Sequence, residues 1–342
     1  MFPYLLLVLF ELIFAYFGRK HKIARIFAFL IVGLFVGLRY NVGTDYESYS
    51  NYFYFDDSFL EPGFNLLVSS LQRFRYGETY MFLTMSLFTY GAIYLFIENN
   101  KYSKCYFPLI LMFTLLTVST TCNGIRQSLA VALFLLSTRF IQNRDFFSFL
   151  GFIILAFLFH KSVLLVLPFY FLKEKYFDKK VYIVIYLISF IFVFFNLQTL
   201  MNPFMFVIAK NERYINLVEG SSSNGYLSLG ILMQIFNYII LLLFLLKNEM
   251  HKKQPLFFNL FFISCVLMNM RVGAPLMNRV MMYFSWFSFV LLPLTLIEEK
   301  SSRTKSLIKI YFVFWYSSSA INYIAFDEIG SMNPYHDALG IF

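Results

Sequence analysis

Charged residues and cysteines are both scarce in this 342-residue chain. Only 14% of its residues are charged, against about 25% in a typical soluble domain. The three cysteines, Cys105, Cys122 and Cys265, stand singly in or beside apolar segments, so no disulfide framework or zinc cluster is indicated. No basic residue precedes the first apolar run, which argues against a cleaved signal peptide and for an external N-terminus.

Hydrophobic residues make up 59% of the chain, in runs that recur along its whole length. The runs are continuous rather than alternating, which favours membrane helices over a barrel. The net charge of +9 needs no nucleic-acid partner, because basic residues gather in cytoplasmic loops of membrane proteins. We therefore expect an all-α polytopic integral membrane protein, with one membrane domain over residues 1–342.

Twelve apolar segments are predicted as transmembrane or re-entrant helices. The region 146–172 is either two short segments meeting at His160-Lys161-Ser162 or one long kinked helix. Long external loops are expected near 39–78 and 198–228. In the first loop, EPGFNLLVSSLQRF predicts an amphipathic helix that begins at Pro62 and lies on the outer leaflet or across the bundle mouth. The segments are 2–17, 23–38, 79–98, 105–121, 126–141, 146–160, 163–172, 181–197, 229–246, 256–270, 280–297 and 307–326.

The two sides of this topology differ in the type of basic residue. The cytoplasmic side holds 19 of the 28 Lys and Arg, mostly lysine, as the positive-inside rule requires. The external side holds mostly arginine, whose planar fork of donors matches phosphate and carboxylate oxygens. This bias indicates an external anion site; the alternative is pairing with the 11 external Asp and Glu. The external set is Arg39, Arg73, Arg75, Arg126, Arg213, Arg271, Arg279, Lys161 and Lys210.

Arg39 opens the stretch RYNVGTDYESYSNYF at the external end of the second segment. Gly43 allows a sharp turn there, and Asp45 and several tyrosines follow at the bilayer surface. Two simpler readings stay open, namely an aromatic belt for the tyrosines and an arginine that reaches lipid phosphates.

Arg126 lies in TTCNGIRQSLA, where we expect Asn123 to cap the fifth segment and to place Arg126 and Gln127 in its first turn. Free N–H groups and the helix dipole make such a position suited to an anion. The alternative is simple anchoring at the membrane interface.

The motif FLFHKSVLLVLP puts His160 and Lys161 near the external leaflet. Histidine is a natural general base near neutral pH, although a lone intramembrane histidine can also be a satisfied hydrogen-bonding residue. Ser162 lacks the surroundings of a hydrolase nucleophile.

A fourth motif, RVGAPLMNRVMMYF, holds Arg271, Arg279 and Tyr283. Its glycine and proline predict a short, sharply turned connection of the kind that lines cavities. Arg279 opens the following helix, with Tyr283 one turn below on the same face.

The order RYNVGTDYESY, EPGF, IRQSLA, FHKSVLLVLP and NRVMMYF resembles the EpsG-like branch of the Wzy-type polysaccharide polymerases, over about residues 39–284. The resemblance implies a bacterial cytoplasmic-membrane enzyme whose active site faces outward. Such enzymes transfer a growing glycan from undecaprenyl diphosphate to an incoming lipid-linked repeat unit. A GT-C-like fold, similar to that of the O-antigen ligases, and catalysis without a metal or other cofactor are also implied, with a chain-length-regulating co-polymerase as a further partner.

These implications assign roles to the candidate residues. Arg126 and Arg279 would stabilise the diphosphate, with Arg39 as a third clamp or a loop anchor. His160 would be the base that deprotonates the acceptor hydroxyl, with Asp45 as the second choice or its partner. The remaining substrate-binding candidates are Gln127, Lys161, Tyr46, Tyr283 and Arg271.

Three other functions are alternatives to the polymerase. A lipid-linked oligosaccharide flippase should show pseudo-symmetric halves and arginines on both leaflets, whereas the sequence shows no such repeat and its arginine bias is one-sided. A membrane O-acyltransferase would place its catalytic residues toward the cytoplasm, opposite to His160. A nonenzymatic scaffold leaves the arginine excess unexplained.

Overall fold

The computed structural model describes residues 2–55, 60–99, 117–172, 175–193, 235, 237–270, 277–303, 305–308, 310, 332 and 334–341. Regular structure in these residues is helical, apart from one isolated antiparallel bridge between Arg39 and Asp337. This confirms the all-α prediction for the described part of the chain, while the twelve segments and the GT-C-like architecture stay predictions. The chain forms two compact units, residues 1–170 with 292–342 and residues 171–291.

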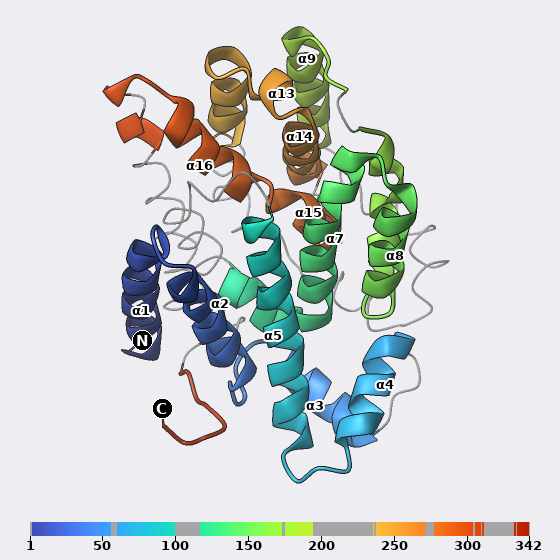
Figure 1. Ribbon diagram of the computed structural model, residues 1–342. Helices are drawn as coiled ribbons and strands as arrows, with labels where there is room; N and C mark the ends of the chain where they lie inside the picture. Colours follow the sequence, from blue (N-terminus) through green and yellow to red (C-terminus); the bar gives the residue numbers. More distant parts are fainter. Residues whose placement is uncertain are drawn as a thin grey trace. The chain divides into compact units, whose positions relative to one another are not determined.

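The first unit is built on five helices that pack side by side in the order in which they occur along the chain. α1 packs on α2, α2 on α5, α5 on α7, and α7 on α8 (Figure 1). α7 buries most of its residues, whereas the outer α1 leaves large apolar side chains such as Leu5 and Leu9 exposed. The five helices are α1 (Phe2–Gly18), α2 (Lys22–Gly37), α5 (Gly77–Glu98), α7 (Ile125–Asn143) and α8 (Phe146–Phe157).

The segment between α2 and α5 contains two short helices, α3 (Tyr46–Phe55) and α4 (Pro62–Leu71). α4 confirms the amphipathic helix: Pro62 stands in its first turn, and Phe64 and Val68 are buried. α4 packs on α5. α3 was not predicted, because its tyrosine-rich sequence resembles an interfacial belt as much as a helix.

The ambiguous region 146–172 is two segments. α8 ends at Phe157, and the 3₁₀ helix η2 (Lys161–Leu172) begins three residues after α8's C-cap at Leu158. Pro168 lies inside η2, where a missing N–H and a fixed φ disfavour a regular α-helix. His160 therefore lies at a break between helices rather than inside one.

The last described residues return to the end of α2. The Tyr335 ring stacks on Phe35 with centroids 4.2 Å apart, and its hydroxyl donates to the Phe35 carbonyl at 2.6 Å. The backbone of Tyr40 donates to the His336 carbonyl at 2.8 Å, and Ala338 donates to the Leu38 carbonyl at 2.7 Å. Residues 335–338 are thus part of the packing around the end of α2.

The second unit centres on α14 (Pro255–Met270), which packs against α9 (Lys179–Phe190), α13 (Met250–Lys253) and α15 (Met277–Ser285). Inside it, the Tyr182 hydroxyl donates to Asn259 Oδ1 at 2.6 Å. The remaining elements are η3 (Ile191–Val193), η4 (Leu243–Lys247) and the beginning of α16 (Ser288–Glu298).

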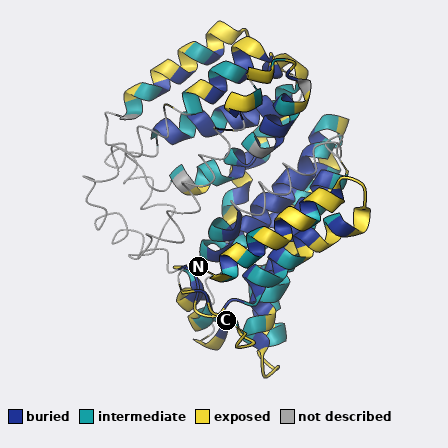
Figure 2. Ribbon diagram, turned by 90° about the vertical axis from the view of Figure 1, so that its left-hand side faces the viewer, coloured by how far each residue is buried: buried dark blue, intermediate teal, exposed yellow. Residues whose placement is uncertain are grey.

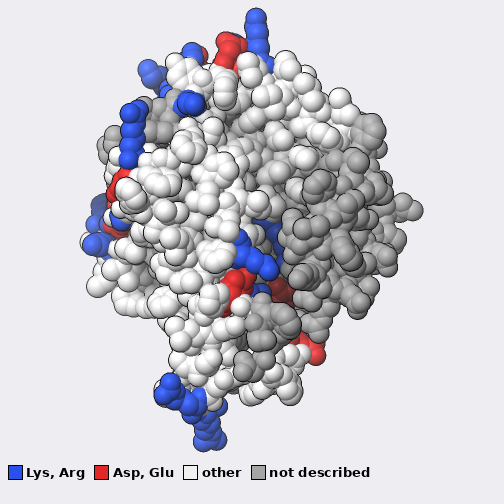
Figure 3. All heavy atoms as spheres, turned by 90° about the vertical axis from the view of Figure 1, so that its right-hand side faces the viewer, with Lys and Arg blue, Asp and Glu red and all other residues white. Residues whose placement is uncertain are grey.

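Two described helices, Gly77–Glu98 and Arg279–Ile297, are long and apolar enough to cross a membrane, and several apolar helices of 10–17 residues accompany them. Within single helices, buried residues tend to lie on one side and exposed residues on the other (Figure 2). Uncharged side chains cover most of the described surface in Figure 3. The predicted loop 198–228 and most of the segments 105–121 and 307–326 lie outside the described residues.

Candidate active site

The carboxylate of Glu61 contacts three polar partners within the first unit. Glu61 is the N-cap residue of α4 (φ −65°, ψ 144°), but its side chain accepts no capping hydrogen bond from that helix. The side chain is only 9% exposed and turns instead toward α7 and the α8–η2 break. Three separate elements therefore meet at this one carboxylate.

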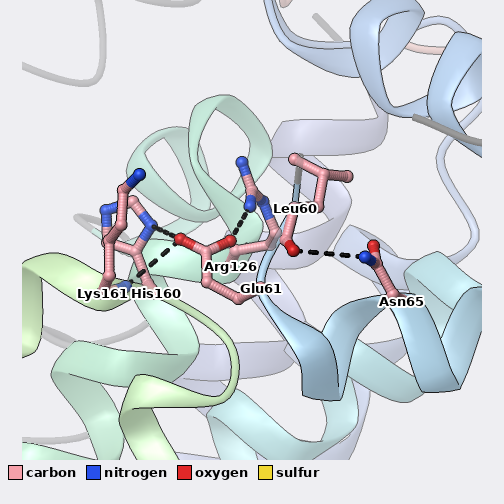
Figure 4. Close-up of polar contacts among 6 residues, drawn as sticks. All are labelled: Leu60, Glu61, Asn65, Arg126, His160 and Lys161. Atoms are coloured by element: carbon pink, nitrogen blue, oxygen red, sulfur yellow. Dashed lines mark hydrogen bonds and ion pairs between the residues drawn. The ribbon is translucent and has the colours of Figure 1, made fainter. Parts of the chain in front are cut away.

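Each oxygen of Glu61 has its own contacts (Figure 4). Oε2 accepts a hydrogen bond from Arg126 Nη1 and forms an ion pair with it. Oε1 accepts from the backbone N–H of Lys161 at 3.2 Å and lies 3.6 Å from His160 Nδ1. The carboxylate thus joins two residues, Arg126 and His160, that are 34 positions apart in sequence.

Local backbone geometry explains why α4 begins at this point. The N–H groups of Gly63 and Phe64, in the first turn of α4, donate to the Leu158 carbonyl at the end of α8, at 2.9 and 3.3 Å. A Cβ on Gly63 would lie 2.8 Å from that carbonyl oxygen, so only glycine permits this approach. Because His160 follows Leu158 by two residues, this contact holds the imidazole beside Glu61.

Arg126 occupies the first turn of α7, as predicted, and is largely buried, with 15% of its side chain exposed. Its guanidinium lies 5.6 Å from the centroid of Tyr49 and 5.3 Å from that of Phe64, within cation–π range. Burial raises the pKa of the Tyr49 hydroxyl, although the Arg126 charge opposes this, so Tyr49 stays neutral. Arg126 therefore pairs with an acidic residue, which was the alternative to anion binding for the arginines predicted to be external.

Arg39 is 1% exposed, and its guanidinium donates to three backbone carbonyls. Nη1 donates to Val36 O at 2.6 Å, Nε to Val42 O at 3.0 Å and Nη2 to Cys122 O at 3.3 Å. Its guanidinium carbon also lies 4.5 Å from the Phe82 ring centroid. Arg39 was predicted to be either a third diphosphate clamp or a loop anchor. These contacts with the backbone are those of a loop anchor.

The anchor fixes the turn that leads into α7. Gly43 adopts φ +98°, and a Cβ there would lie 2.7 Å from Cys122 O, so glycine is needed for both conformation and space. The prediction that Asn123 caps α7 is wrong, since Gly124 is the N-cap residue and no side chain caps the helix. Asn123 Oδ1 instead accepts from the Thr44 backbone N–H at 2.8 Å, because the 39–45 loop lies against it.

The other candidates of the first unit lie around this framework. Asp45 is half-buried directly before α3, and its backbone carbonyl accepts from Tyr49 at 3.0 Å. The ring of Tyr46 is stacked on Phe82 at 4.6 Å and is 6% exposed, which makes it part of the core. Gln127 is also buried, at 6% exposure, whereas the Lys161 side chain is exposed.

The candidates from the fourth motif belong to the second unit. Arg279 is exposed in the first turn of α15, as predicted, and Tyr283 is 1% exposed one turn later. Arg271 lies outside the described residues. Convergence of Arg279 with the arginines of the first unit stays a prediction.

The sequence reasoning missed Glu61. The motif EPGF was interpreted as a helix start because of its proline. Glu61 was counted only as one of the 11 Asp and Glu predicted to be external. The available signal was the residue type: a Glu directly before a first-turn proline is a poor capping residue, so its carboxylate is free for other partners. The described residues include no group of three or more His, Cys, Asp or Glu able to hold a metal ion.

The chain is mostly apolar and helical, as expected of a membrane protein, and it contains a buried Glu–Arg–His cluster. Because buried charges persist only when they are paired, this cluster indicates a specific polar site. Comparison with known families makes this more specific. The model of the EpsG family matches residues 22–336, and the chain therefore belongs to the EpsG family, a family of Wzy-like polysaccharide polymerase-type proteins. The match confirms the resemblance and extends beyond the motifs that carried it. No curated protein and no solved structure matches the chain.

Proposed function

We propose that this protein polymerises lipid-linked oligosaccharide repeat units on the outer face of the bacterial cytoplasmic membrane. The growing glycan leaves undecaprenyl diphosphate and is transferred to the non-reducing-end hydroxyl of an incoming lipid-linked unit. Family membership supports a polysaccharide polymerase-like role. The observation that carries the mechanism is the Glu61 carboxylate, which joins a candidate base to a candidate diphosphate ligand.

His160 is the proposed base. With a proton on Nδ1 facing Glu61, the proton-accepting nitrogen of the ring is Nε2, which lies on the side away from the carboxylate (Figure 4). Nε2 takes the proton of the acceptor hydroxyl as that oxygen attacks the anomeric carbon of the donor glycan. The carboxylate stabilises the imidazolium that forms, as an oriented acid partner does in other base-assisted transfers.

Departure of the lipid diphosphate completes the transfer. The bond from the anomeric carbon to the phosphate oxygen breaks, its electron pair stays on that oxygen, and His160 later returns its proton to solvent or to the departing phosphate. Arg126, whose side chain is 15% exposed, provides positive charge for the negative charge that develops on the phosphate oxygen. Lys161, exposed beside it, is a second phosphate ligand.

In this proposal Arg279 also binds the diphosphate, and Tyr283 and Arg271 take part in substrate binding. Asp45 remains the alternative base or partner of His160. A chain-length-regulating co-polymerase is the expected protein partner, and neither a metal nor another cofactor is needed for the steps described.

The test is incubation of the purified protein, in lipid vesicles, with an undecaprenyl-diphosphate oligosaccharide. We expect a ladder of products that differ by one repeat unit, resolved by gel electrophoresis. Movement of the substrate across the bilayer without chain growth would refute the polymerase and favour the flippase.

The base is tested by His160→Asn, which should accumulate single-unit lipid-linked glycan and lower turnover by about 10²–10⁴-fold, the usual contribution of a general base. His21→Asn is the matched control, because His21 is an exposed residue preceding α2. Wild-type turnover in His160→Asn would move the base elsewhere.

A further inference from the structure

The Glu61 carboxylate competes with the substrate that Arg126 is proposed to bind. Arg126 Nη1 already donates to Glu61 Oε2, so the guanidinium charge is neutralised before any diphosphate arrives. Both groups are largely buried, at 15% and 9% exposure, and their attraction is therefore weakly screened by water. A diphosphate must displace this carboxylate, at least in part, to obtain the full charge of Arg126.

Donors of Arg126 and Lys161 are placed to take part in that exchange. The other terminal nitrogen of Arg126 and the ammonium of Lys161 both extend to the same side of the carboxylate in Figure 4. Arg126 Nε is buried with no hydrogen-bond partner in the described part of the chain, so a further donor is uncommitted. An anion at this side would meet two cationic side chains and would draw the guanidinium away from Oε2.

The exchange would change the surroundings of His160. When Arg126 turns to a phosphate, the contacts of Glu61 that remain among the described residues are the Lys161 N–H at 3.2 Å and the imidazole at 3.6 Å. A buried carboxylate without its cation interacts more strongly with a protonated neighbour, because a buried charge is costly unless it is paired. Stabilisation of the imidazolium therefore increases at the moment when the donor diphosphate is bound.

We infer that Glu61 is a positioning residue that couples diphosphate binding at Arg126 to proton removal by His160. The inference rests on the proposed function and deepens it: the base reaches full strength only with a lipid diphosphate in place. Such coupling limits loss of the donor glycan to water, because proton removal is disfavoured until the diphosphate and Arg126 are engaged.

Glu61→Gln tests the coupling, since glutamine keeps the shape of glutamate and removes its charge. We expect undecaprenyl diphosphate to bind the variant about tenfold more tightly, because no internal anion competes for Arg126. Turnover should fall by about 10²-fold or more, because the imidazolium loses its counter-ion. Affinity is measured by calorimetric titration of purified protein in detergent, with inorganic pyrophosphate as a second probe that isolates the headgroup.

Two further variants make the result decisive. Glu61→Asp keeps the charge but shortens the side chain, so affinity should stay within about twofold of wild type while turnover falls. Glu47→Gln is the matched control, because Glu47 is an exposed glutamate in the first turn of α3; both measurements should stay at the wild-type level.

Unchanged or weaker diphosphate binding in Glu61→Gln would overturn the inference, as would tighter binding in Glu61→Asp. Neither result would touch the proposed polymerase, which stands or falls on the product ladder of the wild-type protein. Conversely, a wild-type protein that makes no ladder would end the proposed function, even with the Glu61→Gln binding change present.

Discussion

Breaking the Arg126–Glu61 pair from one side should cost more stability than removing both charges. Arg126→Ala leaves the Glu61 carboxylate, 9% exposed, without its cation. Loss of one partner of a buried ion pair typically destabilises a protein by about 3–5 kcal/mol, whereas replacing both partners is often nearly neutral. We therefore expect Arg126→Ala to unfold at a temperature roughly 10 °C below wild type, and Arg126→Ala/Glu61→Gln to recover most of that loss.

Activity should follow the opposite rule. Both variants lack the guanidinium, so neither should extend a glycan chain, although the double variant is folded. The assay combines thermal unfolding in detergent with the product ladder, and turnover is expressed per folded protein. This separates the structural role of Arg126 from its role in the transfer.

A second ion pair supplies the control. Arg25 Nε lies 2.6 Å from Glu98 Oε1, and the two side chains are 13% and 18% exposed, much like the pair at the site. Arg25→Ala should lower the unfolding temperature by a similar amount while the folded protein keeps wild-type turnover. An Arg126→Ala protein as stable as wild type would refute the buried pair, and a double variant that makes polymer would refute the assignment of Arg126 to the diphosphate.

Three further substitutions probe the surrounding framework. Gly43→Ala should destabilise the protein by about 1–3 kcal/mol, seen as a lower unfolding temperature, because it combines positive φ with a contact of 2.7 Å to Cys122 O; Gly91→Ala, with nothing within 4 Å, should change little. Arg39→Lys should cost about 3 kcal/mol or more in the same measurement, since one ammonium cannot serve the three carbonyls that the guanidinium reaches, and a wild-type unfolding temperature would contradict the anchor role. Arg279→Ala should abolish the product ladder while leaving the unfolding temperature unchanged, because its side chain is exposed, and Arg279→Lys should recover little. Normal polymer in Arg279→Ala would remove it from the diphosphate site.

The helices could be predicted from the sequence because continuous apolar runs depend only on local composition. The break at His160 and the start of α4 at Pro62 were also accessible, since proline and a polar triplet interrupt a helical pattern locally. The helix α3 was missed, because its stability comes from tertiary contacts such as the stacking of Tyr46 on Phe82.

Only part of the candidate site could be predicted from the sequence, because the rest depends on tertiary contacts. Arg126 and His160 were found through residue type and position at helix ends. Their connection was not, because it depends on Glu61, which is 65 positions from Arg126 along the chain and meets it only after α4 docks on the end of α8. Arg39 shows a second limit of sequence-based prediction. The sequence around an arginine at a helix end does not reveal whether its N–H donors face a ligand or the protein's own backbone.

The pairing of Tyr40 and Leu38 with His336 and Ala338 has a consequence for biogenesis. About 300 residues separate the partners, so residues 336–338 must be synthesised before the end of α2 can acquire these contacts. Until then, the Tyr40 N–H and the Leu38 carbonyl lack these partners. A truncation before residue 335 should consequently lower the unfolding temperature, because it removes packing from the distant end of α2.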